Sequence, residues 1–327
     1  MKFRNNDILL YIAMGDAYAA AVEYLKRGSA DNDRIYLESM KFERYLAHPT
    51  HRHAAGFYTD DAEMSVANAR ALISIDFRHL DPFCFAYYWL AEFVRGGKRK
   101  GYARGGPRGG FQKFLEVCVA DVGGEVSRSC AHKFLDNIRP HSKKNGACMR
   151  AVPFGALANV HDGMRLADLQ GRITHDTAEG RFSAQAVAAM AHYAMYSDKP
   201  MHDVGRYCKK ILPRDMVERW GYVFDSVWPS GTAVTSRKKR SVAITTVHAT
   251  CSHLRQYDSL KRIMMAIIQD GGDTDSVAAI AWGIASCRMQ DEVLPDFLEH
   301  CLEGGNPKTG AVYLKDLGTQ LMDRFSS

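Results

Sequence analysis

The chain has 327 residues, of which 46% are hydrophobic and 24% are charged. This composition is typical of a folded globular protein and excludes general disorder, and no stretch approaches the roughly 20 apolar residues of a membrane-spanning helix. The 43 Lys and Arg residues outnumber the 37 Asp and Glu residues, which gives a formal charge of +6. This mild excess favours anionic ligands or partners, but we expect neither a nucleic-acid nor a membrane partner.

The eight cysteines are scattered, and no two of them form a Cys-x-x-Cys pair. Their spacing therefore predicts neither a zinc site nor a redox motif. The first residues faintly resemble a signal peptide, but their apolar run is short and bracketed by Asp7 and Asp16, so we expect no export signal. We expect a cytoplasmic protein whose cysteines are reduced and packed as small apolar groups.

Apolar residues recur at steps of three and four along most of the chain, which is the spacing of a buried helix face. In chain order, the clearest faces lie at residues 8–13, 64–72, 182–193 and 277–284. Residues 242–247 are the best candidate for a strand because they are rich in β-branched side chains, although they can equally begin a helix. The pattern predicts an all-α protein, and we expect a single domain over residues 1–327.

Two stretches that are rich in glycine or positive charge predict exposed loops, at about residues 96–110 and 229–240. Helical patterns resume on both sides of each stretch, so neither is interpreted as a domain boundary. The first stretch resembles an RGG tract, which is weak evidence for RNA binding inside a folded chain. We interpret both as basic loops that face solvent or substrate.

Two groups of carboxylates each lie directly before an apolar helical run, at residues 59–61 and 273–276. One interpretation is helix capping. Asp60 and Glu63 have the spacing of a capping box, and Asp273 can cap the helix that follows it.

A second interpretation is metal binding, because a cap needs one side-chain oxygen while each group offers two carboxylates and a hydroxyl. Two unit charges about 4 Å apart repel by roughly 4 kcal/mol at an effective dielectric near 20. Four converging carboxylates would therefore need cations, and hard oxygen ligands select Mg²⁺ or Mn²⁺. Gly271 and Gly272, directly before the second group, would let the backbone approach a ligand closely.

Five short segments together match the motifs of a known family in order. They are Gly15-Asp16-Ala17 with Glu23, Thr59-Asp60-Asp61, the loop from Ser142 to Arg150, Ile173-Thr174-His175, and Gly271-Gly272-Asp273-Thr274-Asp275-Ser276. In these segments the chain resembles the ADP-ribosylglycohydrolases, in particular the group similar to dinitrogenase reductase-activating glycohydrolase. The resemblance implies a compact single-domain helical fold with a binuclear metal centre, and cleavage of an N- or O-glycosidic bond to ADP-ribose.

The resemblance also implies two sets of metal ligands for two divalent cations, Mg²⁺ or Mn²⁺. Thr59, Asp60 and Asp61 would hold one ion. Asp273, Asp275 and Ser276 would hold the other, with Asp275 as a bridging ligand.

For the substrate, the resemblance implies that Ser142, Asn145, Gly146 and His175 contact the ADP-ribose. The catalytic general acid or base would be Glu23 or Asp61, and the residues alone do not decide between them. Asp16 is interpreted as structural, and His48 is interpreted with His51 and His53 as a loop feature that binds no metal.

The function expected from the resemblance is hydrolytic removal of mono-ADP-ribose from a modified protein, with arginine as the first acceptor to consider. The enzyme would either reverse a regulatory modification or give immunity against an ADP-ribosylating toxin, which would then be a partner. Two alternatives stay open: a non-catalytic protein that binds a toxin or ADP-ribose, and a metal-dependent nucleotide phosphohydrolase.

Overall fold

The computed structural model describes residues 2–50, 54–96, 126–236 and 240–326. Throughout these ranges the regular structure is helical, and pairing between extended segments is limited to two isolated β-bridges, His141 with His175 and Val234 with Gly272. The prediction of an all-α protein is therefore confirmed.

The helices of the first half are α1 (Ile8–Ala19), α2 (Ala30–Ser39), α3 (Asp60–Ser74), α4 (Pro82–Arg95), α6 (Arg128–Asn137), α7 (Val160–His175) and α8 (Ala178–Tyr196). Those of the second half are α9 (Val204–Ile211), α10 (Arg214–Trp220), α11 (Tyr222–Asp225), α12 (Val242–Gln256), α13 (Leu260–Asp270), α14 (Thr274–Ala285), α15 (Phe297–His300) and α16 (Ala311–Arg324). The four predicted helix faces lie in α1, α3, α8 and α14. Residues 242–247 begin α12, so this ambiguous run is a helix and not a strand.

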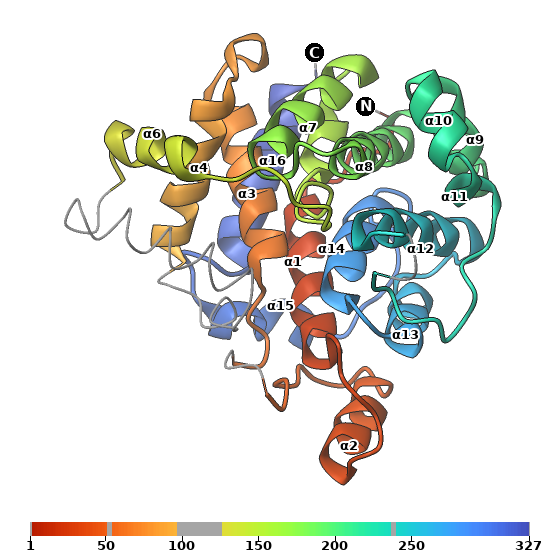
Figure 1. Cartoon of the computed structure of the whole chain (residues 1–327). Helices are drawn as coiled ribbons and strands as arrows, with labels where there is room; N and C mark the ends of the chain where they lie inside the picture. Colours follow the sequence, from red (N-terminus) through yellow and green to blue (C-terminus); the bar gives the residue numbers. More distant parts are fainter. Residues whose placement is uncertain (1, 51–53, 97–125, 237–239, 327) are drawn as a thin grey trace.

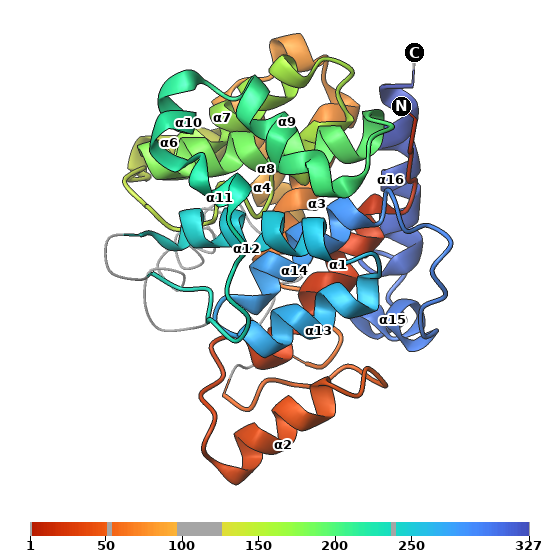
Figure 2. The same cartoon turned by 90° about the vertical axis from the view of Figure 1, so that its right-hand side faces the viewer.

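Helix α1 runs through the interior of the fold, where it contacts α3, α14 and α16 (Figure 1). Every residue of α1 except Tyr11 is buried. A helix that is apolar on all sides fits such a central position. The view in Figure 2 shows that α2, in contrast, stands away from the other helices at one end of the molecule.

Two glycines allow α1 and α14 to cross at very short range. A Cβ atom on Gly15 of α1 would lie 2.7 Å from the carbonyl oxygen of Ala278, and one on Gly283 of α14 would lie 2.5 Å from Cγ1 of Ile12. The contacts pair a later residue of α1 with an earlier residue of α14, so the two helices run antiparallel. The end of α1 therefore lies beside the beginning of α14.

A hydrogen bond closes this end of the helix pair. The Thr274 hydroxyl, at the first residue of α14, donates to the carbonyl oxygen of Ala19 at the last residue of α1 (2.9 Å). The chain that leaves α1 toward Glu23 is thus held next to the helix N-terminus that carries Asp273 and Asp275.

Helix α1 also holds the beginning of α3. Asp16 is fully buried, and its carboxylate accepts hydrogen bonds from the backbone N–H groups of Thr59 and Ala62 and from the Thr59 hydroxyl, each at 2.9 Å. These donors lie at the start of α3, whose N-cap residue is Thr59, and the Thr59 side chain makes no capping hydrogen bond itself. The structural role expected for Asp16 thus takes the form of a cap supplied by another helix.

The described residues include little of the first predicted basic loop and most of the second. Residues 97–110 of the first lie outside the described residues. In the second, residues 229–236 and 240 are described, and Val234 is buried against the Gly271–Gly272 turn. This part of the second loop is therefore packed onto the chain beside the acidic residues.

The sequence predicts cysteines that are reduced and packed, and no membrane-spanning helix. The seven cysteines within the described ranges form no disulfide, and five of them are buried. Among the described helices, none combines the length and the apolar character needed to cross a bilayer.

Replacing Asp16 with Asn tests the cap on α3. Oδ2 of Asp16 accepts both backbone N–H groups, and Oδ1 accepts the Thr59 hydroxyl. An amide would place an NH₂ against that hydroxyl and remove the charge that strengthens the other two bonds, so the free energy of unfolding should fall by about 1–3 kcal/mol. Urea denaturation at pH 8 measures it, since burial raises the pKa of Asp16 to about 7 and the wild-type group is ionised there. Asp198→Asn, at an exposed position, is the control and should change stability by less than about 0.5 kcal/mol. Equal stability of wild type and Asp16→Asn would contradict the capping role.

Candidate active site

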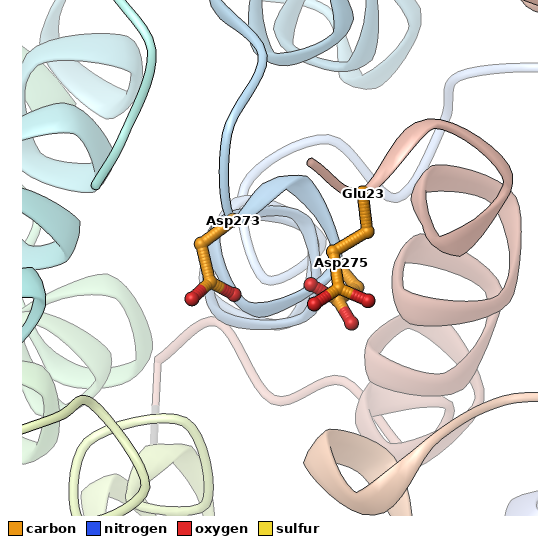
Figure 3. Close-up of side chains that lie close together, drawn as sticks. All are labelled: Glu23, Asp273 and Asp275. Carbon is orange, nitrogen blue, oxygen red and sulfur yellow. The ribbon is translucent and has the colours of Figure 1, made fainter. Parts of the chain in front are cut away.

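Three buried carboxylates converge where α1 and α14 meet. One oxygen from each of Glu23, Asp273 and Asp275 lies within 4.8 Å of the others, and each residue is at most 1% exposed. Figure 3 shows Asp273 and Asp275 at the beginning of α14 and Glu23 on the segment that follows α1. Throughout the described part of the chain, this is the one group of three or more His, Cys, Asp or Glu side chains that approach so closely.

Such a group fits a hard divalent cation. Three acidic side chains this close repel one another strongly in a low-dielectric interior, and a cation offsets the repulsion. Oxygen donors are the ligands that Mg²⁺ and Mn²⁺ prefer. The buried Ser276 hydroxyl, one residue after Asp275, makes no hydrogen bond within the described residues and adds another oxygen donor.

The turn that carries Asp273 is fixed by the glycine pair before it. Gly271 and Gly272 adopt φ of +72° and +85°, which side-chain-bearing residues rarely adopt. A Cβ on Gly272 would lie 2.2 Å from the carbonyl oxygen of Val234. Hydrogen bonds from Val234 N–H to Gly271 O (2.9 Å) and from Asp273 N–H to Val234 O (2.8 Å) join the two segments.

The close approach that Gly272 makes is therefore to Val234. The sequence predicts that Gly271 and Gly272 let the backbone approach a ligand, and it gives no sign of the contact with Val234. That expectation stays a prediction, and the pairing with Val234 is sufficient to require glycine at position 272.

The other acidic group lies at the start of α3. Asp61 is fully buried and accepts a hydrogen bond from the Thr59 hydroxyl (3.1 Å), whereas Asp60 is partly exposed. Neither aspartate belongs to the group formed by Glu23, Asp273 and Asp275. The assignment of Thr59, Asp60 and Asp61 to a second ion stays a prediction.

The capping interpretation of both acidic groups is wrong. Helix α3 begins at Asp60 with Thr59 as N-cap, and its cap is Asp16, so Asp60 and Glu63 form no capping box. Asp273 occupies the N-cap position of α14, but its side chain makes no capping hydrogen bond. Asp273 accepts a hydrogen bond from the Tyr24 hydroxyl and Asp275 one from the Ser276 N–H, so these carboxylates have partners other than a capping box.

Cys148 shows that the acidic groups and the Asn145 loop share one region. Its thiol is completely buried, and burial raises its pKa to about 12. The charges of Asp61 and Asp273 contribute to the same rise in pKa. The Ser65 hydroxyl of α3 donates to the carbonyl oxygen of Met149 (3.2 Å), so the Asn145 loop also contacts the helix that carries Asp61.

Asn145 forms a tight turn and links it to α12. Its carbonyl oxygen accepts hydrogen bonds from the N–H groups of Cys148 (2.9 Å) and Met149 (3.0 Å), and its side-chain Nδ2 donates to the Thr246 hydroxyl (3.3 Å). The neighbouring Ser142 is partly exposed and accepts a hydrogen bond from the Lys144 N–H (3.2 Å).

Gly146 and His175 are in direct contact. A Cβ on Gly146 would lie 2.6 Å from Cε1 of the His175 ring. Burial, together with the charges of Arg150 and Lys144, lowers the pKa of His175 to about 3, so the ring is neutral at physiological pH.

The hydrogen bonds around His175 favour one tautomer. Arg150 Nη2 donates to the Thr174 hydroxyl oxygen (2.7 Å), and this hydroxyl lies 2.7 Å from Nδ1 of His175. Because arginine only donates, the Thr174 proton is left for Nδ1. Nε2 then carries the ring hydrogen and is a donor on the side of Gly146, where it lies 3.0 Å from the Cβ position.

Comparison with known proteins identifies the family. The ADP-ribosylglycohydrolase family profile matches residues 7–326. The chain belongs to this family. The enzyme is therefore a hydrolase that acts on glycosidic bonds of ADP-ribose, and the resemblance found in the motifs is confirmed.

The solved structures agree on the fold. One described as "ADP-ribosylglycohydrolase-related protein complex" matches with a TM-score of 0.68 and 21% identity, over 98% of this chain and 97% of that chain. No curated protein sequence matches the chain.

Sequence reasoning identified most residues of this region but missed two. The Tyr24 hydroxyl donates to Asp273 Oδ2 in the acidic group. The His48 ring binds the carbonyl oxygen of Glu23 through Nε2. The one available signal for Tyr24 was its position directly after Glu23. His48 is buried and lies outside the carboxylate group, and its interpretation as a loop feature that binds no metal stays a prediction. His51 and His53 lie outside the described residues.

The pKa of His175 predicts a pH effect on stability. Between pH 6.5 and 3 the unfolded chain binds a proton at this ring and the folded protein does not, so His175 lowers the free energy of unfolding as the pH falls. His175→Gln keeps an amide donor and does not titrate, so its stability should fall less steeply between pH 6.5 and 4.5. Urea denaturation across this range compares the two proteins, and identical slopes would contradict a buried, neutral His175.

Proposed function

We propose that this ADP-ribosylglycohydrolase is a metal-dependent enzyme that removes mono-ADP-ribose from a modified protein, with arginine as its acceptor residue. The observation that carries the proposal is the convergence of Glu23, Asp273 and Asp275 within 4.8 Å in the interior. The family as a whole generally uses divalent metals, and the acidic group provides the oxygen donors that such ions need.

We assign Glu23, Asp273, Asp275 and Ser276 to one cation and residues 59–61 to a second. Bound there, Mg²⁺ or Mn²⁺ would polarise ribose hydroxyls and lower the pKa of a water molecule at the anomeric carbon. The local fold supports this role, because the positive end of the α14 dipole already favours negative charge at Asp273 and Asp275.

The chain's own residues orient the substrate. In this proposal the turn at Asn145 and Gly146 would offer backbone N–H groups, and the Nε2–H group of neutral His175 would offer a donor beside it. We propose that these donors bind the diphosphate of ADP-ribose, since anions are commonly held by such backbone turns. Ser142, which is partly exposed, would contact the same ligand.

A carboxylate then moves the proton between water and the leaving group. Glu23 and Asp61 are the two candidates. Both are buried, and either would lose basicity when it binds a cation directly. Because the proposal assigns Glu23 to one cation and Asp61 to the other, the two carboxylates stay equal candidates for this proton transfer.

The acceptor protein defines the biological role. We propose two sources for the modification: a regulatory transferase of the same cell, and an ADP-ribosylating toxin to which the enzyme gives immunity. In both cases the reaction removes the same group from the same type of side chain. The site would therefore catalyse the same reaction in both roles.

Release of free ADP-ribose from an arginine-ADP-ribosylated protein tests the proposal. Mg²⁺ or Mn²⁺ should support release, and EDTA should abolish it. The Asp60→Ala plus Asp275→Ala variant should lose at least about 100-fold in rate, because each change removes a carboxylate ligand. Asp198→Ala plus Asp258→Ala, at two exposed positions, is the matched control and should release ADP-ribose at the wild-type rate.

The products separate the alternatives. Release of inorganic phosphate in place of ADP-ribose would indicate a nucleotide phosphohydrolase. Tight binding of ADP-ribose or of a toxin, with no release from arginine- or serine-linked substrates, would indicate a binding protein. Either result would contradict the proposed function, and release from serine alone would correct the acceptor.

A further inference from the structure

Tyr24 connects the surface of the enzyme with the buried acidic group. The residue as a whole is 43% exposed, yet its hydroxyl donates a hydrogen bond to Asp273 Oδ2 (2.7 Å), and Asp273 is only 1% exposed. The tyrosine ring therefore forms part of the wall that covers one of the three converging carboxylates.

The backbone of Tyr24 is held in an uncommon conformation. Its φ of +51° lies in the left-handed region, which a bulky residue rarely adopts. The Tyr24 N–H donates to the carbonyl oxygen of Gly272 (2.7 Å). Both the backbone and the side chain of this residue are thus fastened to the segment formed by Gly272 and Asp273.

The peptide group between Glu23 and Tyr24 is fixed from both sides. Its N–H binds Gly272, and its carbonyl oxygen lies 3.0 Å from Nε2 of His48. The Thr50 N–H donates to Nδ1 of His48 (3.1 Å), so Nδ1 is the acceptor and Nε2 carries the hydrogen that binds the Glu23 carbonyl. His48 is buried, which keeps this contact away from water.

We propose that Tyr24 is a positioning residue for the metal site, with His48 supporting it from the other face of the same peptide group. A carboxylate has two oxygens, so a phenol that holds Oδ2 of Asp273 sets the direction in which the other oxygen faces a cation. The fixed peptide group sets the position of Glu23 in the same way. Hydrogen bonds of this kind to metal ligands commonly contribute tenfold to a hundredfold in metal affinity.

This inference rests on the metal dependence given in the proposed function, and Mn²⁺ binding tests it without any substrate. Tyr24→Phe removes only the hydroxyl and keeps the ring. Titration of the metal-free protein with Mn²⁺, followed by the electron paramagnetic resonance signal of the free ion, should show about a tenfold weaker affinity for Tyr24→Phe than for wild type. Activity of the variant should recover at correspondingly higher Mn²⁺.

The matched control is Tyr313→Phe. The Tyr313 hydroxyl also donates to a buried carboxylate, Glu92 (2.9 Å to Oε2), which is not part of the acidic group. This variant should bind Mn²⁺ as wild type does. Thermal unfolding of all metal-free proteins checks that Tyr24→Phe is folded.

A second pair of variants tests the other face of the peptide group. His48→Ala removes the donor to the Glu23 carbonyl and should also weaken Mn²⁺ binding. His48→Gln retains an amide donor near the position of Nε2 and should restore part of the affinity. If His48 had a purely structural role, both variants would have a lower melting temperature, but Mn²⁺ affinity would not decrease in the order wild type, His48→Gln, His48→Ala.

The outcomes separate the two proposals. Wild-type protein that binds no Mn²⁺ would overturn the metal centre and the positioning role with it. Wild-type binding that is unchanged in Tyr24→Phe and in His48→Ala would overturn the positioning role alone and leave the proposed function in place.

Discussion

The antiparallel contact between α1 and α14 is the constraint on which the site depends. Two helices can approach this closely only where side chains are absent, and Gly15 and Gly283 provide the space. The crossing brings the end of α1 to the beginning of α14, and the Thr274 hydroxyl closes the junction on Ala19. Glu23, Asp273 and Asp275 meet there because the two helices fix the segments that carry them.

The same central helix orders the second acidic segment. Asp16 extends from α1 to cap α3, so one rigid and almost fully buried element positions both helix N-termini. Precise sites are more readily built on such packed elements than on loops. Burying the Asp16 carboxylate is unfavourable, as its raised pKa shows, and the three hydrogen bonds from α3 compensate part of that cost.

Much of this arrangement follows from the sequence. Apolar spacing predicts helices where α1, α3, α8 and α14 lie, and the motifs identify the acidic residues, the loop around Asn145 and the end of α7 at His175. Local patterns fail where the partner is distant in the chain. Asp60 and Glu63 have ideal capping-box spacing, yet Asp16, more than 40 residues earlier, supplies the cap.

Other contacts were beyond sequence reasoning for the same reason. The pairing of Val234 with Gly272 and the hydrogen bond from Tyr24 to Asp273 depend on how separate segments meet in space. A tyrosine after a glutamate carries no signal that its hydroxyl reaches a carboxylate 249 positions away. Residues 242–247 were ambiguous because β-branched residues suit a strand, and packing of α12 against α8 and α14 favours the helix.

The most direct test of the account is a crystal structure of the enzyme with Mn²⁺, with anomalous data collected near the manganese absorption edge. If these carboxylates form a metal centre, a strong anomalous peak lies between Glu23, Asp273 and Asp275, and a second peak lies beside Asp60 and Asp61. An acidic group without any anomalous peak, in crystals that hold Mn²⁺ in excess, would contradict the central claim that these carboxylates form a metal centre.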